Sequence, residues 1–250
     1  MHLMSKFRDA FSDTRVIAAG HAAGLKFAAR HADPNFARGS YERPLQDVVA
    51  DNLVPGDVFY DIGANIGFFS LLAARRVTAQ GRVYAFEPVP DNAAVIVRNA
   101  ALNGFASIEV YNEAVGARTG RAELNLAHHI GGAVLASAGE PPDMRGSMQV
   151  DVVALDDVIA RRKLRRPALV KIDVEGAELD VLSGMRQTLS AHRPKVVYEI
   201  DDASRAGVVR KAADISAFLT GLGYVLTALP AAYPNDTWQV VHVLAKPGAH

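Results

Sequence analysis

Ionisable side chains occur at alternating positions where one apolar stretch of the sequence ends, at Lys171, Asp173 and Glu175. If a β-strand continues through them, the alternation places all three on one face of a sheet. Such a group can shift the pKa values of its members and supply a proton acceptor. The alternative is a salt-bridged strand end, followed by a helix whose N-terminus carries Glu175 and Glu178. Glu199 ends the next apolar stretch, and we expect it to face the same cleft or, alternatively, to be a surface acid.

A glycine-containing turn follows an earlier apolar stretch, in the sequence VFYDIGANIG at residues 58–67. Gly63 and Gly67 have no Cβ, so they allow positive φ and a close approach of a ligand to the backbone. Glu87 follows a second apolar stretch, where a carboxylate can accept hydrogen bonds from both hydroxyls of a ribose. These features predict a site for a cofactor that contains a nucleoside. The alternative is a turn that serves tight strand-to-helix packing alone.

The spacing of this turn argues against two common classes of nucleotide site. Asn65 stands where dinucleotide-binding proteins have the second glycine of GxGxxG, so no diphosphate cradle is expected. Asparagine tolerates the left-handed backbone conformation, so the turn itself is retained. The turn also lacks the Lys-Ser/Thr ending of a P-loop, which argues against nucleoside triphosphates. A nucleoside without phosphates fits better.

The elements that must position these residues alternate between strand and helix. Strands are predicted at residues 58–60, 82–86, 107–111, 168–172 and 195–200, and helices at 68–76, 91–103, after 156, from about 177 and at 215–222. This alternation is typical of a parallel sheet covered by helices. Residues 224–229 and 238–245 predict an antiparallel pair of strands at the sheet edge.

The N-terminal part of the chain lies outside this alternation. The first thirty residues are predicted to form helices with one apolar face, whose members are Met4, Phe7, Phe11, Val16 and Ile17. Residues 34–40 predict a break, and residues 46–52 predict a further helix. We therefore divide the chain into an N-terminal helical segment, 1–54, and a cofactor-binding domain, 55–250. The apolar face either covers the active site or forms an interface in a homo-oligomer.

A Gly/Pro-rich stretch at residues 128–146 interrupts the middle of the sequence, between predicted strands at 121–127 and 148–153. It is predicted to be a mobile loop or lid. His128 and His129 lie in it, and a histidine there can act as a base or contact a substrate. The alternative is an exposed pair of histidines without a role.

The composition favours a small or neutral partner. The 27 basic and 27 acidic side chains cancel, and no basic stripe supports binding to nucleic acid or to an anionic membrane. The absence of cysteine excludes a disulfide framework, a thiolate nucleophile and a thiolate metal site. Charged residues within the first thirteen positions argue against a signal peptide or a spanning helix. We expect a soluble, cytoplasmic protein.

Four ordered motifs carry a resemblance to a known family: DIGANIG at 61–67, FEP at 86–88, NEAVG at 112–116 and KIDVEGAE at 171–178. Together they resemble the FkbM family of S-adenosylmethionine-dependent methyltransferases, over roughly residues 39–200. The resemblance implies an α/β class I methyltransferase fold, which is Rossmann-like. Its sheet has seven mainly parallel strands, with helices on both faces and an antiparallel C-terminal strand.

The resemblance also implies roles for particular residues. Asp61 is expected near the amino-acid end of S-adenosylmethionine, Glu87 on its ribose, and Asn112 and Glu113 at its adenine. Tyr41 and Glu42 are possible contacts of the methionyl group, or else belong to an exposed loop. The full set of predicted cofactor-binding residues is Tyr41, Glu42, Asp61, Gly63, Ala64, Asn65, Gly67, Glu87, Pro88, Asn112 and Glu113. Turn or strand-end roles are the alternatives for Asp61, Glu87 and Asn112.

The expected reaction is O-methylation of a hydroxyl on a sugar, polyketide or related small metabolite. Asp173 is the first candidate for the general base, Glu175 and Glu199 follow, and Lys171 would hold or tune them. His128 is a further candidate catalytic residue. A divalent cation held by these acids is possible, although no spacing in the sequence supports a metal site. The alternatives are a nicotinamide-dependent oxidoreductase and a non-catalytic cofactor-binding module.

Overall fold

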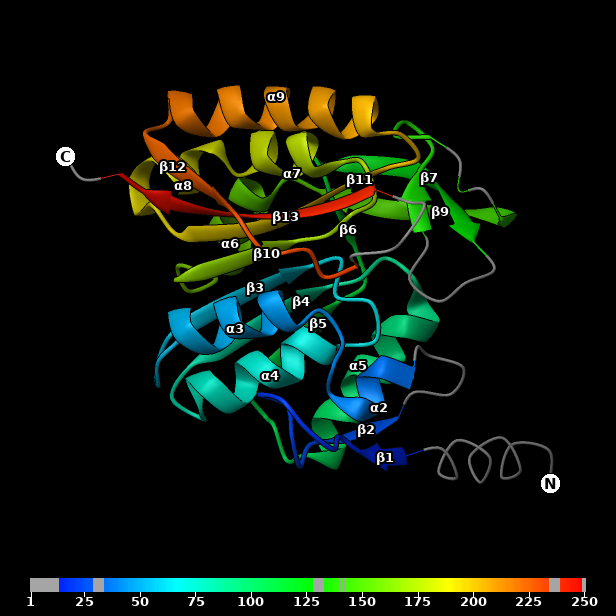
Figure 1. The fold of residues 1–250 in the computed structure, drawn as a ribbon, viewed down its shortest axis with the longest axis vertical. Helices are drawn as coiled ribbons and strands as arrows, with labels where there is room; N and C mark the ends of the chain where they lie inside the picture. The colour runs from blue at the N-terminus through cyan, green and yellow to red at the C-terminus, as the bar shows by residue number, and fades with distance from the viewer. Residues whose placement is uncertain are drawn as a thin grey trace.

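A central sheet of seven strands runs through the computed structural model, which describes residues 14–28, 34–127, 133–139, 141, 143–233 and 239–248 (Figure 1). The strand order is β12-β13-β11-β10-β3-β4-β5. The parallel strands are β3 (Val58–Ile62), β4 (Arg82–Phe86), β5 (Ile108–Tyr111), β10 (Leu169–Ile172) and β11 (Lys195–Asp202). The last strand, β13 (Gln239–Pro247), runs antiparallel to both β11 and β12 (Tyr224–Ala228). The predicted fold class is confirmed.

Helices cover both faces of this sheet (Figure 1). One face carries α3 (Arg43–Asn52), α4 (Phe68–Val77) and α5 (Pro90–Leu102), and the other carries α6 (Leu155–Arg162), α7 (Glu178–Gly184), α8 (Arg186–His192) and α9 (Arg205–Gly221). Alternate residues of each strand enter different cores, so Phe59 packs with α4 while Tyr60 packs with α6 to α9. Every residue of β3 is buried, which agrees with its apolar sequence apart from Asp61. Within the described residues, no helix combines the length and hydrophobicity needed to cross a bilayer.

The strand order reverses direction beside β3. From β3 the chain adds β4 and β5 on one side, and it later adds β10 and β11 on the other. In open α/β sheets, ligands bind at the carboxyl ends of the strands where this reversal occurs. The fold therefore places residues 61–67, which end β3 and continue beyond it, beside the residues that follow β10.

The N-terminal segment differs from the prediction. Within the described residues, 14–28 form a hairpin of β1 (Thr14–Val16) and β2 (Lys26–Ala28) instead of helix, because Gly20 and Gly24 adopt positive φ in the turn between them. The apolar face expected from Met4, Phe7 and Phe11 lies outside the described residues. The break predicted at 34–40 is also wrong, because α2 (Pro34–Arg38) forms there. Proline is well suited to its first position, and Gly39 follows its end with φ 76°.

A second sheet of four strands accounts for the irregular middle of the chain. Its order is β6 (Ala114–Val115), β9 (Met144–Val153), β7 (Gly120–Ala127) and β8 (Ala133–Leu135). The predicted loop at 128–146 therefore contains a strand, β8, and the start of β9. Short strands such as these carry too little periodic signal to be separated from loop in a sequence. His128 and His129 lie outside the described residues.

Candidate active site

A cavity of about 740 Å³ opens at the carboxyl ends of the central strands. Ten residues predicted from the sequence line it: Tyr41, Glu42, Gly63, Asn65, Glu87, Pro88, Glu113, Asp173, Glu175 and Glu199. Five others do not belong to its lining, namely Asp61, Ala64, Gly67, Asn112 and Lys171. The volume is in the range of sites for small ligands.

Residues 63–67 form a tight turn that enters the cavity wall. Gly63, Asn65 and Gly67 all have positive φ, at 72°, 51° and 86°. A Cβ added to Gly63 would stand 1.8 Å from the carbonyl oxygen of Asp173, so only glycine allows this approach of the two strand ends. Gly67 instead packs against Ile96 of α5. The left-handed conformation expected of Asn65 is confirmed.

Glu87 is held in place by backbone amides. Its Oε2 accepts a hydrogen bond from the Asn65 N–H at 2.8 Å, and its Oε1 accepts one from the Val89 N–H at 2.9 Å. The side chain is 5% exposed, and burial raises its pKa to about 7 although these amides act in the opposite direction. A carboxylate fixed in this way beside the glycine turn has acceptor lone pairs available for ligand hydroxyls.

The two residues that follow β5 have different surroundings. The Asn112 side chain donates to the carbonyl oxygens of Glu87 and Pro88, at 2.8 and 2.9 Å, and so ties the turn after β4. This is the turn role that the sequence left open. Glu113 lines the cavity and is held by both terminal nitrogens of Arg162, at 2.8 and 2.6 Å.

Lys171 and Asp61 form a buried ion pair below the cavity. Their charged atoms are 3.5 Å apart, with side chains 3% and 0% exposed, and the Ser70 hydroxyl donates to the other oxygen of Asp61 at 2.6 Å. Asp61 is thus engaged within the protein. Lys171 also donates to Asp173 Oδ2 at 3.0 Å, and Asp173 does line the cavity. Burial lowers the pKa of Lys171, but the charges of Asp173 and Asp61 raise it. The net effect is a pKa above the usual range. The lysine therefore stays charged and orients Asp173.

Glu175 does not continue the strand. β10 ends at Ile172, and Glu175 has φ 53° in the turn before α7, so the expected sharing of one strand face by Lys171, Asp173 and Glu175 is wrong for Glu175. It lines the cavity all the same. Burial, followed by the charge of Asp201, raises the pKa of Glu175 to about 10. It therefore holds a proton at neutral pH.

Tyr41 and Glu42 close the cavity from the N-terminal segment. The Tyr41 ring lies 4.0 Å from the Phe36 ring, centre to centre, and Glu42 is the residue before α3. The Tyr233 hydroxyl, from the segment after β12, donates to Glu42 Oε1 at 2.6 Å. Burial raises the pKa of Glu42, and the charge of Asp173 raises it further.

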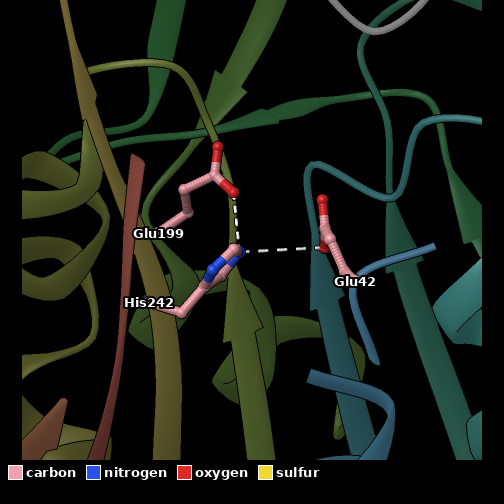
Figure 2. Close-up of side chains that lie close together, drawn as sticks. All are labelled: Glu42, Glu199 and His242. Atoms are coloured by element: carbon pink, nitrogen blue, oxygen red, sulfur yellow. Dashed lines mark ion pairs between the residues drawn. The ribbon is translucent and has the colours of Figure 1, made fainter. Parts of the chain in front are cut away.

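His242 is a member of this site that the sequence did not single out. Its Nε2 lies 2.7 Å from Glu199 Oε2 and 3.8 Å from Glu42 Oε2, between the two carboxylates (Figure 2). The residue is 3% exposed, and burial lowers the pKa of its imidazole. His242 lies opposite Glu199 in the sheet, and this position could have been predicted only by pairing β13 with β11 in the correct register.

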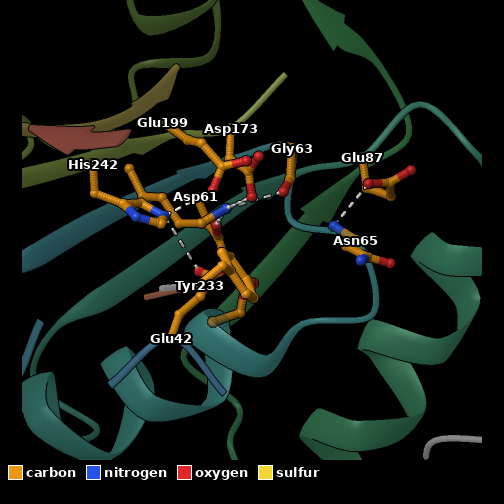
Figure 3. A network of polar contacts seen from close by, with 11 residues as sticks. Glu42, Asp61, Gly63, Asn65, Glu87, Asp173, Glu199, Tyr233 and His242 are labelled. Atoms are coloured by element: carbon orange, nitrogen blue, oxygen red, sulfur yellow. Dashed lines mark hydrogen bonds and ion pairs between the residues drawn. The ribbon is translucent and has the colours of Figure 1, made fainter. Parts of the chain in front are cut away.

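The polar residues form two groups on the cavity wall (Figure 3). Glu87 and Asn65 lie on one side, and the group containing Asp173, Glu199 and His242 lies on the other, with Gly63 between them. One side thus offers acceptors for ligand hydroxyls beside bare backbone. The other offers carboxylates that can accept a proton.

Comparisons with known proteins identify the family. A model of the methyltransferase FkbM domain matches residues 61–226. The chain is 31% identical over 202 residues to the 31-O-demethyl-FK506 methyltransferase FkbM of Streptomyces tacrolimicus, covering 70% of this chain and 75% of that protein. It is 27% identical to the hexuronic acid methyltransferase AglP of Haloferax volcanii, covering 60% and 59% of the two chains.

The fold agrees with this assignment. A crystal structure of the methyltransferase FkbM from Methylobacillus flagellatus superposes with a TM-score of 0.52 at 20% identity. The match covers 86% of this chain and 56% of that one, so the present chain spans just over half of its length. The match to the FkbM domain extends from the glycine turn, through the strand that carries Glu199, into β12. The chain belongs to the FkbM methyltransferase family.

Proposed function

We propose that this protein transfers a methyl group from S-adenosylmethionine to a hydroxyl oxygen of a small metabolite, such as a sugar or a polyketide. The observation that carries the proposal is the presence of two polar groups on one cavity wall, with Glu87 at one side and Asp173 at the other. The family supports methyl transfer over the nicotinamide-dependent alternative. A cytoplasmic location and a homo-oligomer remain predictions from the sequence.

The residues of the first group fit a nucleoside-bearing methyl donor. Glu87 would accept hydrogen bonds from the ribose hydroxyls, and the bare backbone of Gly63 leaves room for the ligand beside it. Pro88 and Glu113 extend the lining beyond Glu87. When bound, S-adenosylmethionine supplies a methyl carbon on a positively charged sulfur, and the electron pair of the breaking carbon–sulfur bond remains on the sulfur.

The residues of the second group would position and deprotonate the acceptor. Asp173 is fixed by the charged amine of Lys171 at 3.0 Å and faces the cavity, so it can orient a hydroxyl and take its proton as the new carbon–oxygen bond forms. Glu199 lines the same wall and is the second candidate. Burial raises the pKa of both Glu199 and Glu175 above the usual range, so Asp173 is preferred to either as the base. His128 stays a prediction.

The relatives suggest the acceptor class. One is a methyltransferase of 31-O-demethyl-FK506 and another of hexuronic acid, and by their names the first acts at an oxygen and the second on a sugar acid. A hydroxyl of an oxygen-rich metabolite is therefore the acceptor that we propose. The cavity volume of about 740 Å³ leaves room for part of such a molecule beside the methyl donor.

Thermal unfolding with S-adenosylhomocysteine or NAD⁺ tests the cofactor. At 100 times its Kd, a ligand adds about 2.7 kcal/mol to the unfolding free energy, which for a chain of this size raises Tm by roughly 5–11 °C. We expect this rise with S-adenosylhomocysteine and none with NAD⁺. The reverse pattern would overturn the proposal. A rise without methyl transfer to any of a panel of hydroxylated acceptors would favour the non-catalytic alternative.

Asp173→Asn tests the base. We expect the variant to bind S-adenosylhomocysteine with nearly unchanged affinity and to lose turnover by on the order of 10²-fold, because the amide cannot accept the proton. Asp180→Asn, at an exposed position on α7, is the control and should keep wild-type turnover. Unchanged turnover in Asp173→Asn would move the role to Glu199.

A further inference from the structure

Three potential metal ligands from distant parts of the chain meet beside the cavity, whose lining includes two of them, Glu42 and Glu199. Glu42 precedes α3, Glu199 lies on β11 and His242 lies on β13 (Figure 2). One ligand atom from each lies within 4.8 Å of the other two, and two of the three distances are 2.7 and 3.8 Å. Ligand atoms about 2.1 Å from one shared cation stand roughly 3–4.2 Å apart. The 3.8 Å separation lies within this range, and the 2.7 Å separation between His242 and Glu199 would have to widen slightly to admit a cation.

Two of these ligand atoms have no hydrogen-bond partner. Glu42 Oε2 and His242 Nε2 are both fully buried without one, in side chains that are each 2% exposed. Nε2 lies close to Glu199 but makes no hydrogen bond with it. Leaving a buried polar atom unpaired costs about 1–3 kcal/mol, so two such atoms facing each other point to a missing partner.

The neighbouring side chains hold these ligands in place. The Tyr233 hydroxyl occupies Glu42 Oε1 at 2.6 Å and leaves Oε2 directed at His242. A hydrogen bond to the outer oxygen of a ligating carboxylate is the usual arrangement around protein-bound metals. Glu42 and Glu199 line the cavity, so a cation between them would be reached from it.

The surrounding charges favour a cation. Asp173, Glu175 and Asp201 line the same cavity as Glu42 and Glu199, and the charges of Asp173, Glu42 and Asp201 act on the Glu199 carboxyl group. The buried amine of Lys171 is already engaged by Asp61 and Asp173. A divalent cation between Glu42 and Glu199 would add to the partial compensation that this lysine already gives both carboxyl groups.

We propose that Glu42, Glu199 and His242 bind a divalent first-row transition metal, with Mn²⁺ and Zn²⁺ as the favoured ions. A set of one imidazole nitrogen and two carboxylate oxygens suits these ions. Ca²⁺ takes six to eight oxygen ligands and Mg²⁺ prefers oxygen, so the histidine selects against both.

The site would also serve the acceptor, a role that rests on the proposed function. Three protein ligands leave coordination positions that oxygen atoms of a sugar or polyketide could fill from the cavity. Binding to a cation lowers the pKa of a hydroxyl and makes its deprotonation by Asp173 easier. It would also let this acidic wall accept a carboxylated sugar, which the carboxylates alone would repel.

Calorimetric titration of the full chain, stripped with a chelator and dialysed, tests the binding. We expect Mn²⁺ or Zn²⁺ to bind at close to one equivalent, and Mg²⁺ and Ca²⁺ to bind much more weakly. His242→Gln should weaken Mn²⁺ binding at least about 10–100-fold. His21→Gln is the matched control, since His21 has its own carboxylate partner, Asp47 at 2.8 Å, but is exposed. It should bind Mn²⁺ as the wild type does.

Several results would overturn the metal site: no saturable binding of either ion, equal affinity in His242→Gln and wild type, or a preference for Ca²⁺. Circular dichroism in chelator establishes that each variant is folded. If His242→Gln does not fold, Glu199→Gln provides the same test with an isosteric side chain at the cavity. S-adenosylhomocysteine binding to the metal-free protein separates the two proposals. If it persists while no metal binds, only the metal site is wrong; if it is absent with and without metal, the proposed function is wrong.

Discussion

Glu87 combines burial with a proposed role, binding the ribose, that requires charge. Both of its oxygens accept backbone N–H bonds, yet burial still raises its pKa from the ordinary value of about 4.5 to about 7. The folded state therefore holds this proton more tightly than the unfolded chain. Its contribution to the unfolding free energy is complete below about pH 4.5 and is lost as the pH rises through about 7. Ligand binding should depend on pH in the opposite sense, because ribose hydroxyls donate to the ionised form.

Replacing Glu87 by glutamine should weaken S-adenosylhomocysteine binding by about 10–150-fold, the equivalent of a charged hydrogen bond worth about 1.5–3 kcal/mol. In the wild type, affinity should fall as the pH decreases from 8 to 6, and this dependence should disappear in Glu87→Gln. Titration calorimetry at several pH values measures both effects. Glu109→Gln, which changes an exposed carboxylate on β5, should behave as the wild type. If Glu87→Gln bound S-adenosylhomocysteine with an unchanged Kd, the proposal that Glu87 binds the ribose would be wrong.

At the level of single residues, the sequence identified side-chain chemistry better than side-chain partners. Asp61 and Lys171 fall in the right motifs, but the structure buries them against each other, out of the cavity lining. Asn112 binds two backbone carbonyls of the neighbouring turn. His242 was missed because a lone histidine in an apolar strand carries no motif. Its proposed role depends on the residue opposite it on β11, Glu199, which lies 43 positions earlier in the chain.

The glycine turn is the element on which the cavity depends. It brings Gly63 against the carbonyl of Asp173, so the ends of β3 and β10 approach more closely than any residue with a Cβ would allow. The same approach carries Asn65 to the carboxylate of Glu87. The turn thus joins the two polar groups of the site.

Gly63→Ala should therefore destabilise the protein by more than about 2 kcal/mol, since it adds a steric clash to the cost of positive φ, and Tm should fall by more than about 4–8 °C. Gly104→Ala is a matched control, with φ 69° against 72° but no atom within 4 Å of the added Cβ. It should lower Tm by about 2–4 °C, through the backbone cost alone. Equal falls in differential scanning fluorimetry would contradict the role given to the close approach.

Regular elements were predictable and irregular ones were not. The β4 bounds of Arg82–Phe86 coincide with the predicted range, because a short, almost fully buried apolar run between a glycine and an acidic residue leaves a clear pattern. Helix α9 begins at Arg205, ten residues before the predicted start, since its polar first turns show little periodicity. The β1–β2 hairpin, whose strands have three residues each, was mistaken for helix. Strands this short are formed by tertiary contacts that no local pattern records.

Across the whole molecule, one face of the central sheet changes from apolar to polar toward its carboxyl end. Leu169, Val197 and Leu244 belong to the core beneath α3 and α4. Lys171, Glu199 and His242 lie on the same strands and the same face, each two positions away from one of these core residues. The fold class could be read from the alternation of elements, but this polar row required the register of three neighbouring strands, β10, β11 and β13. The N-terminal segment then completes the site by placing Glu42 over the row.

Asn99 of α5 connects that segment to the glycine turn. Its Oδ1 accepts a hydrogen bond from the Ala28 N–H at 2.8 Å, and its Nδ2 donates to the Ile66 carbonyl at 3.0 Å. The side chain is fully buried, so neither partner could turn to water if it were removed. One side chain thus holds β2, α5 and the turn that carries Gly63 in a fixed arrangement.

We expect Asn99→Ala to lower the unfolding free energy by about 2–3 kcal/mol, because it leaves a buried N–H and a buried carbonyl unpaired. Tm should fall by about 4–12 °C. Asn103→Ala is the matched control, since Asn103 makes the same kind of bonds to the backbone of Lys26, at 2.8 and 2.7 Å, but at an exposed site where water can replace them. Its Tm should change by no more than about 2–4 °C, the equivalent of about 1 kcal/mol. If both variants lost the same stability, the hairpin would be anchored by its apolar contacts, chiefly the buried ring of Phe27, and the N-terminal segment would be held independently of the glycine turn.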